Sequence, residues 1–363
     1  MSTETSFEHF LKTHDEEAWS ATLATLRRSI HEVDCNATEI WFAFYPLSLF
    51  EVLQASDNRE GLATQLLLQG DYRLSNQIDS SHHFLYGHRF WPQIKKAAEE
   101  HAASWGVGGR VLGVNASDQH PTANTLHPAL AEQILTVAGR VADKLKRDPS
   151  LLVGITAVAF MTIRQVGLGA FKAASGSIVI DAKYSKKSPE QILRERSKDD
   201  SQGLFGFLRT VNKQWTVTWD ENDPAARYKL REGQDLAWGA ADDRSRDWRA
   251  IDPRRIEGPI PVECRAASCG TCWVGVLGGA EKLSDVAARE GKKIKEFGYI
   301  DTAEPKPLIR LACQAQAQGA VSIVIPPWNG QFGKYLKSLR HSEQDLDHPQ
   351  TLPTSTSVND VVN

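Results

Sequence analysis

The sequence predicts an α+β protein in which a mainly helical domain precedes a sheet domain. Residues 5 to about 175 contain few turn signals and repeat apolar side chains at helical spacing, whereas Trp215, Val217 and Trp219 alternate with threonines. A charged stretch separates the two patterns. At 363 residues the chain is also longer than the roughly 100 to 200 residues typical of one domain, so we expect two domains.

The first domain, placed at residues 1–182, is predicted from its apolar spacing and from prolines near helix starts. Apolar stripes mark its first helices, around residues 7–11 and 19–30. Further helices are predicted at about 38–56, 60–69, 90–104, 127–147 and 150–165.

A connector at residues 183–211 follows, because the sequence AKYSKKSPEQILRERSKDDSQG is dense in charge and poor in large apolar residues. Such a stretch is typical of a solvated linker or a lone surface helix.

The second domain is placed at residues 212–328, where the hydrophobic period changes to that of strands. Beyond it, residues 340–363 carry acids, prolines and small polar side chains, and we expect a mobile tail. The predicted elements of the domain are strands at Trp215–Trp219, Arg227–Arg231 and Ala320–Ile325 and a helix at Leu236–Ala241.

Composition excludes several classes of function. The formal net charge of -3 and the pI near 6.4 give no basic field for phosphate backbones, so we expect no nucleic-acid partner. The N-terminus lacks both a basic leader and an apolar core of a signal, which predicts a cytoplasmic protein. The most apolar window, Leu151–Ile163, is shorter than the ~20 residues of a membrane span, so no membrane span is expected.

Four of the five cysteines are grouped late in the chain. Residues 263–272 read ECRAASCGTC, a C-x4-C-x2-C pattern, and the fourth cysteine follows forty intervening residues later in RLACQ. A 2Fe-2S cluster needs four thiolates, and one tight loop of small residues can supply three of them. The predicted ligands of this cluster are Cys264, Cys269, Cys272 and Cys313.

The motif CRAASCGTC followed by a distant RLACQ resembles the plant-type 2Fe-2S ferredoxin family over roughly residues 212–328. The resemblance implies a β-grasp fold and one-electron transfer, with electron-donor and electron-acceptor proteins as partners. It also implies that Cys264 and Cys269 bind the iron nearer the surface, and that Cys272 and Cys313 bind the inner one. Arg265 would lie at the cluster rim.

The sequence departs from the family pattern at three places. Ala267 stands where the family usually has glycine, which predicts a slightly different loop conformation. The stretch Asp242–Pro261 is longer than the usual connection and predicts a cover over the cluster or a surface specific to one partner. Acids and bases are about equally numerous in this domain, whereas small ferredoxins often carry an acidic docking face.

Other uses of the cysteines are open at this stage. Zinc also takes four cysteines but usually through two C-x2-C knuckles, and disulfides fit poorly without a secretory signal. A purely structural cluster is a further alternative, and subunits of the succinate dehydrogenase type would add a second cysteine set, which is missing. Trp273, directly after the third cysteine, either packs in the core or shields the cluster and relays electrons.

The helical half gives weaker signals. His82, His83 and His88 lie among aromatic residues, a composition that suits haem or a metal, although their spacing favours ordinary histidines. WGVGGRVLG, at 105–113, and the glycines near Lys172 miss the spacing of nucleotide-binding loops. Cys35 is interpreted as a small buried hydrophobe.

These observations favour an electron-transfer protein whose helical half serves docking or assembly. Two alternatives stay open. In one, the chain is an oxidoreductase, or a subunit of one, whose helical half binds its own cofactor. In the other, it is a redox-responsive interaction protein whose partner binding changes with the state of the cluster.

Overall fold

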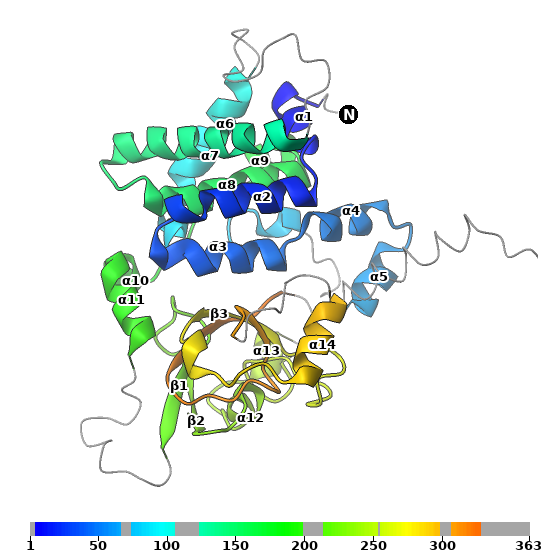
Figure 1. The fold of residues 1–363 in the computed structure, drawn as a ribbon, viewed down its shortest axis with the longest axis vertical. Coiled ribbons are helices and arrows are strands. Elements are labelled where there is room, and N and C mark those ends of the chain that lie inside the picture. Colours follow the sequence, from blue (N-terminus) through cyan, green and yellow to red (C-terminus); the bar gives the residue numbers. More distant parts are fainter. Residues whose placement is uncertain are drawn as a thin grey trace, which may run out of the picture.

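The computed structural model describes residues 4–66, 74–105, 123–198, 213–252, 255–297 and 306–327. A layer of helices lies above a smaller unit built around a sheet, and the connector helices run beside both (Figure 1). This confirms the predicted fold class, an N-terminal mainly helical domain followed by a β-grasp sheet domain. The predicted tail at 340–363 lies outside the described residues.

Helix α8 (Ser150–Val166) forms the centre of the helical half. Every residue from Leu151 to Ile163 is buried, as expected of a helix that is apolar on all sides. It ends at Gly167, whose φ of 83° favours glycine. In the described part of the chain, no helix is both long and apolar enough to cross a membrane. The surrounding helices are α1 (Ser6–Lys12), α2 (Glu16–Leu26), α3 (Glu32–Phe44), α4 (Leu47–Ala55), α5 (Arg59–Gln65), α6 (Trp91–Ser104), α7 (Ala123–Leu145) and α9 (Leu168–Ala173).

The single helix predicted at 38–56 is wrong, because the chain breaks between α3 and α4. Pro46 follows Tyr45, whose φ of -122° and ψ of 58° are not helical. A residue before proline is kept out of the helical region by the proline ring, so α3 ends there and α4 starts after Pro46. Helix α5 covers the start of the helix predicted at 60–69, and residues 67–73 lie outside the described part.

The connector contains two short helices, α10 (Ala182–Ser185) and α11 (Pro189–Ser197). Helix α11 starts with a capping box between Ser188 and Gln191 and with proline at its first position. Its Ile192 and Arg196 are buried, so α11 packs against the rest of the molecule rather than standing free in solvent. Residues 199–212 lie outside the described part.

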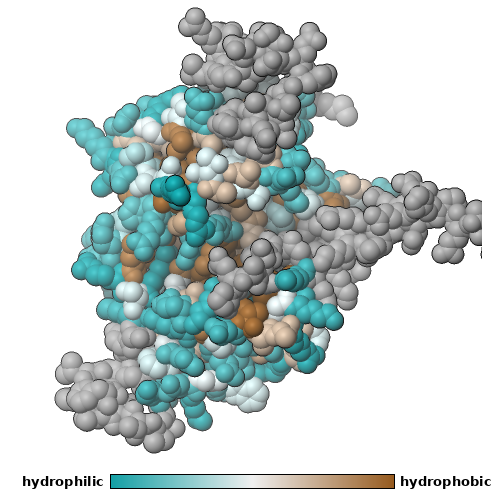
Figure 2. All heavy atoms as spheres, viewed as in Figure 1, coloured by the Kyte–Doolittle hydropathy of each residue, from teal (hydrophilic) through white to brown (hydrophobic). Residues whose placement is uncertain are grey.

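The sheet has five strands in the order β2-β1-β5-β3-β4. Strands β1 and β2 form an antiparallel hairpin, β5 runs parallel to β1, and β3 pairs antiparallel with both β5 and β4. On the face seen in Figure 2, hydrophilic residues predominate and hydrophobic residues show mainly toward the middle. The strands are β1 (Gln214–Thr218), β2 (Arg227–Arg231), β3 (Trp273–Gly278), β4 (Ile309–Leu311) and β5 (Val321–Val324), and the helices beside them are α12 (Leu236–Ala241), α13 (Trp248–Ile251) and α14 (Ala288–Phe297).

Helix α3 packs on β3, which joins the two halves through one continuous apolar core. The rings of Phe44 and Trp273 meet edge to face with centroids 5.1 Å apart. Gly275 lets the strand approach the helix, because a Cβ there would lie 2.5 Å from Cγ2 of Ile40. Burial of Trp273 in this contact agrees with its predicted packing role.

Candidate metal centre

The first three cysteines lie on a tight loop that ends where β3 begins. Arg265 and Ala267 have φ values of 51° and 52°, and Gly270 has a φ of 78°. All three lie in the left-handed region, where residues other than glycine are strained by about 1 kcal/mol or more. Ala267 thus adopts a conformation that suits glycine, although it carries a Cβ.

This curled backbone directs amide groups at sulfur. The N–H groups of Ala266, Ser268 and Cys269 donate to Sγ of Cys264 at 3.4, 3.3 and 3.4 Å. The N–H of Thr271 donates to Sγ of Cys269 at 3.5 Å. Such donors stabilise negative charge on sulfur.

The four thiols form two pairs. Cys264 and Cys269 hydrogen bond to each other and are partly exposed. Cys272 and Cys313 also hydrogen bond to each other, and both are buried. The structure therefore brings all four predicted site residues to one end of the sheet domain as an outer and an inner pair.

The backbone places Cys313 beside the loop. The N–H of Ala312 donates to the carbonyl of Cys272 at 2.9 Å, and the N–H of Ala267 donates to the Cys313 thiol. Nε2 of Gln314 lies 3.5 Å from Sγ of Cys313. The inner pair is thus fixed by backbone contacts between the loop and the end of β4.

Hydrogen bonding shifts the pKa values of these thiols. The hydrogen bond from Cys272 lowers the pKa of Cys313 to about 6, although burial opposes the shift, and Gln314 helps. The same bond raises the pKa of Cys272, and burial raises it further. Burial opposes a lowered pKa at Cys264, but its backbone donors outweigh that effect. One thiol of each pair is therefore prepared to become a thiolate, the form that binds metals.

Two charged residues missed by sequence reasoning hold the strand that leads to Cys313. Nε and Nη2 of Arg310 donate to the two carboxylate oxygens of Glu290 at 2.8 and 2.9 Å, and neither side chain is exposed. Glu290 also accepts from the N–H of Leu311 at 2.9 Å. The only sequence signal was the charge of Arg310 in an otherwise apolar strand.

The outer side of the loop is bordered by Trp238, which is 53% exposed. The guanidinium of Arg265 lies 5.0 Å from the centre of its ring, and Arg265 also pairs with Glu257. The long stretch 242–261 therefore contributes to this border through Glu257. Exposed Ile251 and Ile256 belong to the same stretch.

The other predicted candidates are not brought to the thiols. His82 and His88 are buried in the helical half, where their Nδ1 atoms lie 2.9 Å apart and Nε2 of His82 contacts the carbonyl of Ile78 at 3.2 Å. Burial lowers the pKa of His88 to about 4 and also lowers the pKa of His82 well below its usual value. Both are neutral core histidines. Cys35 is half-buried, and only Trp105 of the stretch 105–113 is described.

A family model described as a 2Fe-2S iron-sulfur cluster binding domain matches residues 253–318. The C-terminal region thus carries a domain of the class that binds a 2Fe-2S cluster and transfers electrons. No family was recognised for the N-terminal part. The comparisons with curated proteins and with solved structures gave no match.

The donor set fits this group. Within the described residues, no three His, Cys, Asp or Glu side chains are gathered as one metal ion requires. The thiols instead stand as two separate pairs, and a 2Fe-2S cluster takes two thiolates at each iron. The loop amides supply the hydrogen bonds to sulfur that such clusters use.

Proposed function

We propose that the C-terminal domain, residues 212–328, is a plant-type 2Fe-2S ferredoxin domain that carries one electron at a time. Its ligands are Cys264 and Cys269 at the outer iron and Cys272 and Cys313 at the inner iron. The observation that carries this proposal is the division of the four thiols into a partly exposed pair and a buried pair at one loop. The mainly helical domain is residues 1–182, the connector is 183–211, and the protein acts in the cytoplasm.

When bound, the cluster supplies a site that accepts and releases one electron. The loop residues bind it and stabilise the negative charge of its thiolates. Three N–H groups already point at Cys264, so charge on the outer sulfur is better compensated than it would be in an extended loop. The contacts of Ala312 and Gln314 hold the inner sulfur in a drier environment.

Redox partner proteins dock at the outer pair in this proposal. Helix α3 covers Trp273, directly after Cys272, so the inner side of the loop is closed by the helical half. The outer side carries the exposed Trp238 beside Arg265. Aromatic and arginine side chains are the commonest anchors of protein interfaces, which makes this border the suitable place for a donor or acceptor.

The helical half serves docking or assembly. It holds the sheet domain through Phe44 and through Arg196, whose Nη1 donates to the carbonyl of Val33 at 2.7 Å. His82 and His88, which suggested a second cofactor, instead form hydrogen bonds with each other and with the backbone. No contact in the described part of the helical half favours the oxidoreductase alternative over a docking role.

The test is an anaerobic visible absorption spectrum of the full chain before and after dithionite, with iron, sulfide and zinc measured on the same sample. We expect about two irons and two sulfides per chain and bands that partly bleach on reduction. An additional sharp haem band would favour the oxidoreductase alternative. A colourless zinc protein would contradict the proposal.

A further inference from the structure

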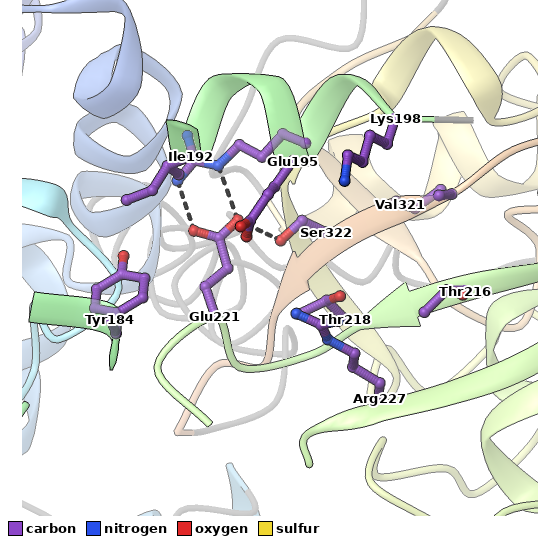
Figure 3. Close-up of a pocket in the computed structure, with 12 residues that line it drawn as sticks. Tyr184, Ile192, Glu195, Lys198, Thr216, Thr218, Glu221, Arg227, Val321 and Ser322 are labelled. Carbon is purple, nitrogen blue, oxygen red and sulfur yellow. Dashed lines mark hydrogen bonds and ion pairs between the residues drawn. The ribbon is translucent and has the colours of Figure 1, made fainter. Parts of the chain in front are cut away.

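A cavity of about 210 Å³ lies between the connector and the sheet, and none of the four cysteines lines it. We call it the connector cavity. Helix α11 forms one wall, β1 and β2 form the second, and the start of β5 forms the third (Figure 3). The cavity therefore lies where the helical half, its connector and the sheet meet.

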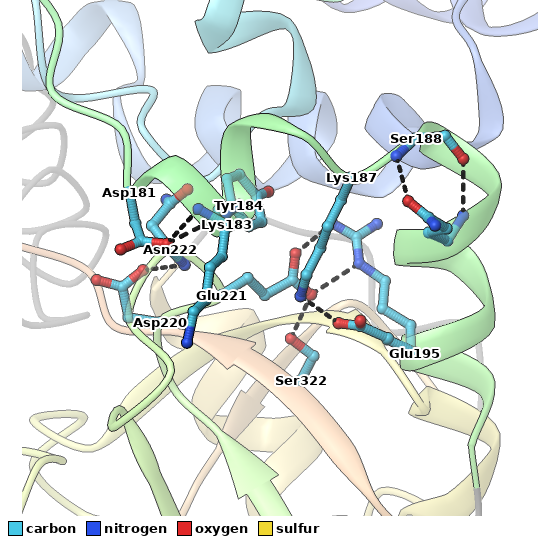
Figure 4. A network of polar contacts seen from close by, with 12 residues as sticks. Asp181, Lys183, Tyr184, Lys187, Ser188, Glu195, Asp220, Glu221, Asn222 and Ser322 are labelled. Carbon is cyan, nitrogen blue, oxygen red and sulfur yellow. Dashed lines mark hydrogen bonds and ion pairs between the residues drawn. The ribbon is translucent and has the colours of Figure 1, made fainter.

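Both acids that line the connector cavity already have partners. Glu221 accepts from Arg196 at 2.8 and 2.9 Å and from the hydroxyl of Ser322 at 2.6 Å. Glu195 accepts from Nζ of Lys187 at 2.6 Å (Figure 4). These acids are therefore not available to neutralise further cations in the cavity.

Two cationic side chains that line the cavity have no acidic partner among the described residues. Within the described part of the chain, neither Lys198 nor Arg227 takes part in an ion pair, and both line the cavity. In Figure 3, the side chain of Arg227 lies beside Thr218 on the hairpin, and Lys198 extends from the end of α11 above β5. Both side chains are exposed and border the cavity from different elements, and an anion bound between them would offset the repulsion of their charges.

The pairing of the strands places the hydroxyl of Thr218 next to Arg227. Thr218 is the direct partner of Arg227 across the β1–β2 hairpin and of Ser322 across the parallel β1–β5 pair. Directly opposed residues in a sheet place their side chains on one face, about 5 Å apart. At another wall, the hydroxyl of Tyr184 is buried and has no hydrogen-bond partner in the described structure.

We propose that the connector cavity binds the phosphate group of a small molecule, or free phosphate. Arg227 supplies a planar donor pair that matches two phosphate oxygens, Lys198 supplies a second charge, and the hydroxyl of Thr218 donates a hydrogen bond. Lys198 follows the connector helix, whereas Arg227 belongs to the hairpin. A bound phosphate thus links the connector to the sheet and stabilises the folded chain.

The test is isothermal titration calorimetry of the full chain with inorganic phosphate and with glycerol phosphate, at constant ionic strength. We expect saturable binding of at least one probe at one site. Glycerol phosphate binding as well as phosphate would indicate an ester ligand, and phosphate alone would indicate the free anion. Saturable binding of neither probe would overturn the proposal.

Variants locate the site. Arg227→Gln should weaken the binding at least about tenfold, because it removes the two-point contact, and Lys198→Gln should weaken it to a smaller extent. Arg231→Gln is the matched control, since Arg231 is exposed on the same strand but does not line the cavity. Equal losses in Arg227→Gln and Arg231→Gln would show diffuse charge attraction and overturn the proposal.

Folding of the variants is checked without phosphate. Arg227→Gln should unfold at or slightly above the temperature of the wild type, because it removes a repulsion rather than a bond. Added phosphate should then raise the unfolding temperature of the wild type and of Arg231→Gln but not that of Arg227→Gln. An equal rise in all three proteins would contradict the site.

Discussion

Both carboxylate oxygens of Glu290 accept hydrogen bonds from the guanidinium of Arg310, and the pair is completely buried. Arg310 stands three residues before Cys313, and Glu290 also accepts a hydrogen bond from the N–H of Leu311. One ion pair therefore fixes the backbone that presents the fourth proposed ligand.

Replacement of Glu290 by glutamine should destabilise the chain by about 3 kcal/mol, because it leaves the charge of Arg310 buried without its partner. Circular dichroism should show a lower unfolding temperature, and bound iron should be lost more readily. Glu281→Gln is the control, since Glu281 is exposed and lies in the same domain. Similar unfolding of the two variants would contradict the role of the pair.

Glycine-to-alanine substitutions test the contact between the two halves. Gly275→Ala should cost about 1 to 3 kcal/mol, since the new Cβ would lie 2.5 Å from Ile40 and 3.0 Å from Val324. Gly139→Ala in α7 should instead stabilise by about 0.5 to 1 kcal/mol, because a Cβ there meets nothing within 4 Å. Thermal unfolding of both variants checks whether their stabilities change in opposite directions. An unchanged stability of Gly275→Ala would mean that the interface is looser.

The strain at Ala267 predicts an unusual response to glycine. Ala267→Gly removes the left-handed strain at φ 52°, whereas Ala266→Gly, at a residue without positive φ, only adds flexibility. We expect the first variant to be more stable than the second by about 1 kcal/mol, measured as the difference in unfolding free energy. Equal stabilities would show that the loop relaxes without cost.

Much of the fold could be predicted because local patterns determine it. Strand β2 alternates exposed and buried residues from Arg227 to Arg231, so the period-two signal was clear. Helix α12 matched its prediction because Asp235 caps it. Helix α8 is apolar on every side and stands between Pro149 and Gly167, which made it recognisable.

Other elements depend on tertiary packing and were not predicted. Strand β3 is buried on both faces under α3, so its sequence WVGVLG shows no alternation of polar and apolar residues. Strand β4 has three residues, too few for a periodic signal. The break at Pro46 was missed because the apolar spacing continues across it.

Part of the candidate site could likewise be predicted from the sequence, and part could not. The cysteine spacing is local, so the sequence alone gave the loop and its four candidate ligands. The partnership of Glu290 with Arg310 spans twenty residues and depends on how α14 packs on β4. The charges of the connector cavity likewise come from segments that only the folded chain brings together.

The most direct test of the central claim is the iron and sulfide content of single cysteine-to-serine variants of the full chain. Cys272→Ser and Cys313→Ser should lose most of both elements, because each removes a thiolate from the inner pair. Cys35→Ser, at a half-buried cysteine of the helical half, should keep the wild-type content. A full complement of iron and sulfide in Cys313→Ser would contradict the proposed cluster site.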